Sequence, residues 1–428
     1  MSNKKHNTSR RTFLKGSLAA TAVGATGTGL LWNPRKAMAA APRDRKFLFF
    51  FAGGGWDTST VFEPKFGDDA GGVDMDDGTY LGSNGSLRWT AGDDRPAVSR
   101  YFDRWGWRSA IINGIDIHSI GHGAGTRFML TGSSASSLSD WPTLLASQTE
   151  VAFSMPHVVF GGPSFAGTRG SALVRGGGGR LIDLIDGSIA GQADTPTPQM
   201  TRPADFMVDA YVHGRIDRFA LSKKGLGRRR GEEILSSIER AMELEGREFE
   251  AGLGQQTRDV FDQAVRATEL MRLGLSRCAM LRIPGGYDTH GGNAPQAPQQ
   301  DAFFDVLDRL MDHMSLTPGH TSPTLMDEVV IVAMSELGRT PRLNGGGGKD
   351  HWPFGSMLVA GPGVNGGRVI GATDPGLVGV TIDHASGLPS ASGDLLGCES
   401  VGSSILRIGG VDADAFLQGV QPLGALIA

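Results

Sequence analysis

Cysteine is scarce in this 428-residue chain, which contains only Cys278 and Cys398. Two cysteines are too few for a disulfide-stapled scaffold, and they form none of the closely spaced motifs that hold haem or iron–sulfur clusters. An electron-transfer protein built on such a group is therefore disfavoured. The sequence leaves open whether the two thiols pair.

The chain also lacks an apolar run long enough to cross a membrane. Its most membrane-like segment, residues 16–32, is interrupted by glycines and falls short of the ~20 strongly apolar residues of a spanning helix. This segment follows Arg10 and Arg11 and precedes a small-residue site, AMA, at residues 37–39. Together these features predict a removable signal peptide, residues 1–39, that uses the twin-arginine translocase. We therefore expect a periplasmic or extracellular protein with no stable membrane span.

A basic excess is missing as well. Removal of residues 1–39 takes away seven of the 41 Lys and Arg residues and none of the 45 Asp and Glu residues, which leaves a formal charge of −11. An acidic body without a basic stripe disfavours nucleic acid as a partner. The remaining residues, 40–428, are numerous enough to bury a large core.

What the chain does contain is a series of short apolar runs that alternate with helical patterns. Residues 46–52 (KFLFFFA) are almost all apolar, as in a strand that is buried on both faces. This alternation predicts an α/β fold with a mainly parallel sheet. Residues 180–275 are mostly polar and helical, which predicts an insertion within the domain formed by residues 40–428. Further strands are expected at residues 109–113, 157–160, 278–283, 329–334 and 356–360.

Acidic and histidine residues follow several of these expected strands. Asp57 comes after the glycine-rich turn that ends the first strand, and Asp288 and His290 follow a later one. Asp288 and His290 are two positions apart, so in an extended segment both point from one face and can bind Zn²⁺ or Mn²⁺. Asp57 could instead cap the next turn, and the Asp-Thr-His segment could lack a ligand. Ligand sites of open parallel sheets lie outside the carboxyl ends of the strands, where such residues can converge.

Two later segments carry the same chemistry. Glu336 follows the strand expected at 329–334 and is either a metal ligand or a partner for Arg339. Arg339 could itself bind an anionic group through its forked guanidinium. Asp350 and His351 stand between a glycine-rich loop and another strand, where they are ligand candidates. In the alternative, Asp350 only orients His351 by a hydrogen bond.

His122 lies in a loop that leads into an expected helix, close to the helix N-terminus, where free backbone amides attract anions. An imidazole at this place can bind a metal, act as acid, base or nucleophile, or face solvent. Arg127, further along the same segment, is a second arginine that could steady an anion.

The order of these motifs resembles the bacterial family called domain of unknown function 1501, from about Phe47 to the C-terminus. The motifs are GGWDT at 54–58, GGYDTHGGN at 285–293, SELGRTPRLN at 335–344 and GKDHW at 348–352. That family looks like a branch of the alkaline phosphatase and sulfatase superfamily, which implies a doubly wound α/β fold with helices on both faces and a two-metal site. The resemblance places candidate metal ligands at Asp57, Asp288, His290, Glu336, Asp350 and His351.

The chain departs from the superfamily pattern at two positions. Leu337 stands where many relatives have a metal-binding histidine, and its side chain cannot bind a metal. Sulfatase-like relatives place the nucleophilic Cys or Ser ten residues before the Gly of a Leu-Thr-Gly ending, where this chain has His122. His122 could form a phospho-intermediate, act as acid or base, or replace the lost ligand, and the last two roles are favoured.

Together with the resemblance, these residues predict an exported metal-dependent hydrolase or transferase that acts on a phosphate- or sulfate-type ester. The substrate would be a small anionic ester or an envelope glycan, and the cofactor one or two ions of Zn²⁺, Mn²⁺, Mg²⁺ or Ca²⁺. His122 would act at the reacting group, and Arg339 or Arg127 would steady the anion. The altered nucleophile position leaves an alternative, a non-catalytic binding or assembly protein that keeps the fold, with or without one metal.

Overall fold

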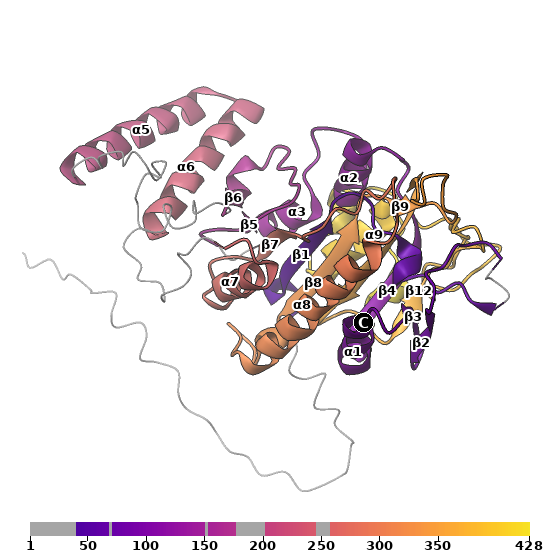
Figure 1. Ribbon diagram of the computed structural model, residues 1–428. Helices are drawn as coiled ribbons and strands as arrows, with labels where there is room; N and C mark the ends of the chain where they lie inside the picture. The colour runs from indigo at the N-terminus through magenta and orange to yellow at the C-terminus, as the bar shows by residue number, and fades with distance from the viewer. Residues whose placement is uncertain (1–39, 68–70, 150–152, 177–201, 245–256) are drawn as a thin grey trace, which may run out of the picture. The chain divides into compact units, whose positions relative to one another are not determined.

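The computed structural model describes residues 40–67, 71–149, 153–176, 202–244 and 257–428 (Figure 1). The expected signal peptide, residues 1–39, and two parts of the expected helical insertion, 177–201 and 245–256, lie outside the described residues. Within the described ranges, no helix is long and apolar enough to cross a membrane.

An eight-stranded sheet forms the centre of the fold, in the order β12-β4-β11-β8-β1-β7-β5-β6. Its strands run parallel except for β11, which pairs antiparallel with both of its neighbours, β4 and β8. The mainly parallel sheet expected from the sequence is thereby confirmed. The strands of this sheet are β1 (Lys46–Ala52), β4 (Ser109–Asp116), β5 (His157–Val159), β6 (Leu173–Arg175), β7 (Cys278–Arg282), β8 (Val329–Ser335), β11 (Phe354–Ala360) and β12 (Arg368–Ile370).

Two short antiparallel pairs accompany the sheet: β2 (Tyr80–Asn84) with β3 (Leu87–Ala91), and β9 (Gly338–Arg339) with β10 (His351–Trp352). The described α-helices are α1 (Pro96–Trp105), α2 (His122–Thr131), α3 (Trp141–Ser147), α5 (Arg202–Ser222), α6 (Leu226–Leu244), α7 (Val260–Arg272), α8 (Gln296–Leu316) and α9 (Cys398–Ile408).

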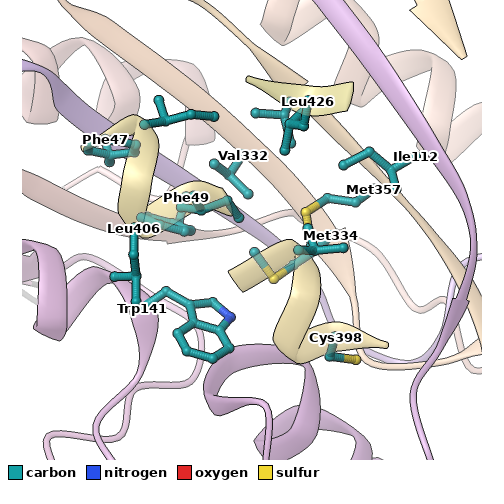
Figure 2. Close-up of a cluster of buried hydrophobic side chains, with 14 of the residues drawn as sticks. Phe47, Phe49, Ile112, Trp141, Val332, Met334, Met357, Cys398, Leu406 and Leu426 are labelled. Atoms are coloured by element: carbon teal, nitrogen blue, oxygen red, sulfur yellow. The ribbon is translucent and has the colours of Figure 1, made fainter. Parts of the chain in front are cut away.

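Helices cover both faces of the sheet, because its central strand β1 is apolar on both sides. Phe47 and Phe49 belong to one core cluster, which they share with α2, α3 and α9. Figure 2 shows these two rings near Trp141 of α3 and Leu406 of α9. Leu48 and the alternate residues of β1 face α1, α7 and α8 on the other side. Burial of each phenylalanine contributes roughly 2 kcal/mol, so β1 is held firmly between two layers. The doubly wound arrangement is confirmed.

Most described residues of the expected insertion are helical and form α5, α6 and α7. Helix α5 contacts α6, whereas α7 packs against β1, β7 and α8, with Val260 and Ala264 buried in the core. The two cysteines are free and buried, so they do not pair in this structure. Burial raises the pKa of both thiols, which makes them unreactive core residues.

Candidate metal centre

The candidate site lies at the edge of the sheet where the parallel strands end. Asp288 follows β7, Glu336 follows β8 directly, and His122 begins α2 after β4. His351 lies in β10, immediately before β11. Because β11 runs antiparallel to β8, the start of β11 lies at the edge where β8 ends. The one antiparallel strand of the sheet therefore brings His351 to residues that follow parallel strands.

His122, Asp288 and His351 form a compact group in which one possible ligand atom of each lies within 4.8 Å of the others. Among the described residues this is the single group of three or more such side chains that could hold a metal. Nε2 of His122 lies 3.5 Å from Asp288 Oδ2, and Nε2 of His351 lies 3.3 Å from Asp288 Oδ1. His290 adjoins the group, with its Nε2 3.1 Å from Asp288 Oδ1 and 2.9 Å from His351 Nε2.

Each of the three imidazoles is held by an acceptor at its Nδ1 atom. His122 Nδ1 donates to Glu336 Oε1 at 2.9 Å, and His290 Nδ1 donates to Asp350 Oδ1 at 2.7 Å. His351 Nδ1 donates to the backbone carbonyl of residue 120 at 2.7 Å. Carboxylates and carbonyls only accept, so the proton of each neutral ring is on Nδ1 and the lone pair is on Nε2. All three Nε2 lone pairs therefore lie on the side of Asp288.

Glu336 and Asp350 thus orient imidazoles at their outer nitrogen, although the sequence predicted both as direct ligands. Glu336 is buried and also accepts the backbone amide of Gly54 at 2.6 Å, instead of pairing with Arg339. Asp350 holds His290, whereas the sequence suggested that it orients the neighbouring His351. Partners of this kind fix the tautomer and direction of a metal-binding histidine.

Arg339 is fully buried and positions Asp288. Its Nη2 donates to Asp288 Oδ1 at 2.7 Å and to the carbonyl of Gly54, while Nε and Nη1 donate to the carbonyls of Gly55 and Lys349 at 2.9 and 3.0 Å. Burial raises the pKa of Asp288, but the hydrogen bond and the positive charge of Arg339 oppose this effect, and the pKa falls to about 2. Asp288 is therefore ionised at neutral pH. The guanidinium that the sequence assigned to a substrate anion is turned toward the protein instead.

Two glycines allow these elements to approach one another. Gly54 has a φ of +114°, and a Cβ there would lie 2.7 Å from the backbone nitrogen of Asp288. A Cβ at Gly125 in α2 would lie 2.5 Å from the carbonyl oxygen of Glu336. Real Cβ atoms do not approach other atoms so closely, so each glycine is needed where the turn after β1 and helix α2 meet the site.

Asp57 is not part of the group. Its side chain is 1% exposed and accepts from the Ser59 amide at 3.0 Å, from Asn293 Nδ2 at 2.8 Å and from Lys349 Nζ at 2.8 Å. Burial raises the pKa of Asp57, but the charge and hydrogen bond of Lys349 outweigh it and lower the pKa. The structure thus shows the capping role that the sequence left as the alternative for Asp57. Lys349, in the GKDHW motif, was missed as the partner of this carboxylate.

The site opens into a cavity of about 490 Å³. His122, Asp288 and Glu336 line one part of it, and Arg282, the last residue of β7, lines another. Arg127 does not line this cavity, because its guanidinium lies 4.3 Å from the ring centroid of Phe165. Arg282 was missed by the sequence analysis, although a charged residue at the carboxyl end of an apolar strand is a recognisable signal.

The arrangement defines an exported α/β protein with an imidazole and carboxylate cluster at the carboxyl edge of its sheet. Residues 7–27 match the twin-arginine translocation pathway signal sequence, which confirms export by that route to the periplasm or the extracellular space. Residues 229–384 match the family described as Protein of unknown function (DUF1501). The match contains Asp288, His290, Glu336 and His351 but not His122.

A comparison with curated proteins finds no match to the chain. Among solved structures, the chain is similar to Ps i-CgsB in complex with k-i-k-neocarrahexaose, at 9% identity and a TM-score of 0.37 over 88% of this chain and 75% of the other. It is also similar to the PsFucS1 sulfatase from Pseudoalteromonas sp., at 10% identity and a TM-score of 0.35 over 92% of this chain and 73% of the other. At these scores the likeness says nothing about the site or the substrate.

Proposed function

We propose that this exported protein is a metal-dependent hydrolase or transferase that acts on a phosphate- or sulfate-type ester. The observation that carries the proposal is the convergence of three imidazole Nε2 atoms on the ionised carboxylate of Asp288, next to an open cavity. Three imidazoles and one carboxylate are donors that suit a divalent transition-metal ion, and the adjoining cavity gives a substrate access to them.

The fit of a cation can be tested on the histidine contacts themselves. Nε2 of His290 and Nε2 of His351 lie 2.9 Å apart, and each ring already has its Nδ1 proton on an acceptor. Two lone pairs at this distance repel one another unless a proton or a metal ion lies between or beside them. A metal ion would remove the repulsion at all three imidazoles at once, so the residues fit the cofactor.

His122, Asp288, His290 and His351 would hold the ion. Imidazole-rich sets favour Zn²⁺ or similar transition metals over Mg²⁺ and Ca²⁺, and the carboxylate also suits Mn²⁺. The described residues contain one such group, so we propose one ion from within them. When bound, a divalent cation acts as a Lewis acid that stabilises negative charge on a phosphate or sulfate oxygen.

The other residues keep this set in place. Glu336 and Asp350 orient two of the imidazoles, and Arg339 keeps Asp288 ionised and pointed toward them. Arg339 has no exposed surface, so a substrate anion in the cavity cannot reach its guanidinium. Its role is to stabilise the carboxylate of Asp288. His122 is the histidine of the group that also lines the cavity, so it lies nearest to an entering ester.

Elemental analysis of the purified mature protein tests the proposal. We expect about one divalent ion per chain, lost in Asp288→Ala and His351→Ala, because each variant removes a ligand. His320→Ala is the matched control, since His320 hydrogen-bonds only the carbonyl of Arg272 among the described residues. The metal-loaded protein should then hydrolyse members of a panel of phosphate and sulfate monoesters. A natively folded protein that takes up no divalent metal would refute the proposal.

One contact favours the second candidate, a non-catalytic protein that binds its ligand through the same site. Thr126 is the aliphatic hydroxyl that lines the cavity, and it donates to the backbone carbonyl of His122 at 2.7 Å. No described base holds its proton, so Thr126 is not an activated nucleophile. Metal binding without turnover on the whole ester panel would support this second candidate.

A further inference from the structure

Arg282 lines the cavity, and its charged guanidinium is not engaged in a polar contact with the described protein. It ends β7 and is exposed, and no described residue forms a hydrogen bond or ion pair with its guanidinium. The other two arginines near the site are occupied. Arg339 is buried against Asp288 and three carbonyls, and Arg127 is stacked on Phe165.

The strands on both sides of β7 leave the space around Arg282 open. Gly53 follows β1, and a Cβ there would lie 3.6 Å from Nη2 of Arg282. Gly161 is the second residue after β5, and a Cβ there would lie 3.2 Å from Cβ of Arg282. Because Gly53 and Gly161 have no side chains, neither residue covers the guanidinium. Its donors are free to bind a ligand in the cavity.

The charges on the cavity wall show what that ligand needs. The charged residues that line the cavity are Arg282, Asp288 and Glu336. His122 is the histidine that lines it. With a neutral His122, two carboxylates and one guanidinium leave the wall slightly negative. An anion is therefore attracted where it reaches Arg282 directly, and a cation bound on the carboxylate side of the wall would strengthen this attraction.

We propose that Arg282 is the anion-binding residue of this cavity and takes a phosphate or sulfate group of the substrate through its forked N–H donors. The inference rests on the proposed function and deepens it, because it names the group that recognises the anion. A guanidinium binds a tetrahedral oxyanion with two parallel hydrogen bonds, which a lysine ammonium cannot reproduce. Arg282 therefore selects substrates by an oxyanion.

Calorimetric titration of the Zn²⁺-loaded mature protein with inorganic phosphate and inorganic sulfate tests the inference. We expect Arg282→Gln to weaken binding by roughly 10- to 100-fold, because charge-assisted hydrogen bonds are lost. Arg282→Lys should recover only part of the affinity. Arg88→Gln is the control, since Arg88 is exposed and hydrogen-bonds only backbone carbonyls. Arg127→Gln tests the arginine that the sequence suggested and should leave binding unchanged.

The outcomes separate this inference from the proposed function. Equal phosphate affinity in the wild type and Arg282→Gln, with metal bound in both, would overturn the role of Arg282 and leave the metal site intact. Absence of any phosphate or sulfate binding by the metal-loaded wild type would overturn it as well. A wild type that takes up no metal, yet binds phosphate more tightly than Arg282→Gln does, would refute the proposed function and support Arg282. If turnover is found, Arg282→Gln should raise KM more than it lowers kcat.

Discussion

Glu336 accepts a hydrogen bond of 2.9 Å from Nδ1 of His122, although 214 positions separate the two residues in the chain. The side chain of Glu336 is 3% exposed, whereas that of His122 is 40% exposed. The carboxylate therefore acts behind the imidazole and turns the Nε2 atom of His122 toward Asp288. Through this hydrogen bond, a glutamate in the second half of the chain orients the histidine that starts helix α2.

Replacement of Glu336 by Gln should weaken metal binding without abolishing it. The variant loses the charge that favours the Nδ1 tautomer of His122, and partners of this kind contribute roughly 10- to 100-fold in metal affinity. Competition with a chelator of known affinity measures the effect. Glu232→Gln, an exposed glutamate of α6 that pairs with Arg228, serves as the control. Unchanged affinity in Glu336→Gln would show that the hydrogen bond has no bearing on the site.

Replacement of Asp57 by Asn should destabilise the fold and leave the metal content unchanged. Asp57 and Lys349 are each 1% exposed, so the variant leaves a buried ammonium without its counter-charge. Loss of one partner of a buried pair costs about 3–5 kcal/mol, measurable by chemical denaturation. Lys349→Met in the same chain should restore part of the stability. Loss of metal from a stable Asp57→Asn protein would instead identify Asp57 as a ligand, as the family resemblance implied.

Replacement of Gly54 by Ala should disturb the site more than the fold. The backbone of Gly54 is in the left-handed region, and the new Cβ would meet the backbone of Asp288 at 2.7 Å. Asp288 has to move, so we expect weaker metal binding. Gly291→Ala is the matched control, because a Cβ there meets nothing within 4 Å and its φ is not positive. Similar metal affinities in both variants would show that the close approach is not required.

Acid should destabilise the protein partly through Glu328, which pairs with Lys46 at 2.8 Å at the edge of the sheet where β1 and β8 begin. Burial raises the pKa of Glu328, but the hydrogen bond and charge of Lys46 and the amides of Thr321 and Ser322 outweigh it and lower the pKa. A lowered pKa means that this stabilisation is complete above the unfolded value of about 4.3 and is lost as the pH falls through the folded value.

Denaturation midpoints measured from pH 7 down to pH 3 test the role of Glu328. Glu328→Gln should be less stable at pH 7 and should lose less stability than the wild type on acidification. Parallel curves for the two proteins would contradict the assignment. Glu232→Gln should follow the wild type over the whole range.

Much of the fold could be predicted because its signals are local. The apolar run of β1, the strand-length runs of β7 and β8 and the twin-arginine pair are each contained in a few consecutive residues. The prediction that residues after these strands share one edge follows from parallel pairing alone. By this rule Asp288 and His290, which follow β7, share an edge with Glu336, which follows β8.

The partners of these side chains could not be predicted in the same way. The antiparallel direction of β11 brings His351 to the carboxyl edge of the sheet. The residues of a short apolar run predict a strand but not its direction in the sheet. Asp57 and Lys349 are both motif residues, yet only their distance in space shows that they neutralise one another. The same holds for Asp350, which faces His290 instead of its neighbour His351.

The sequence by itself determined that the chain is exported and that it forms an α/β sheet with acidic and histidine residues after its strands. The tertiary structure decided which nitrogen of each histidine is free, which arginine is buried and which one is open to a ligand. The reason is physical: the local sequence determines which elements form, whereas hydrogen bonding and burial of polar groups depend on the order and direction in which the strands are assembled.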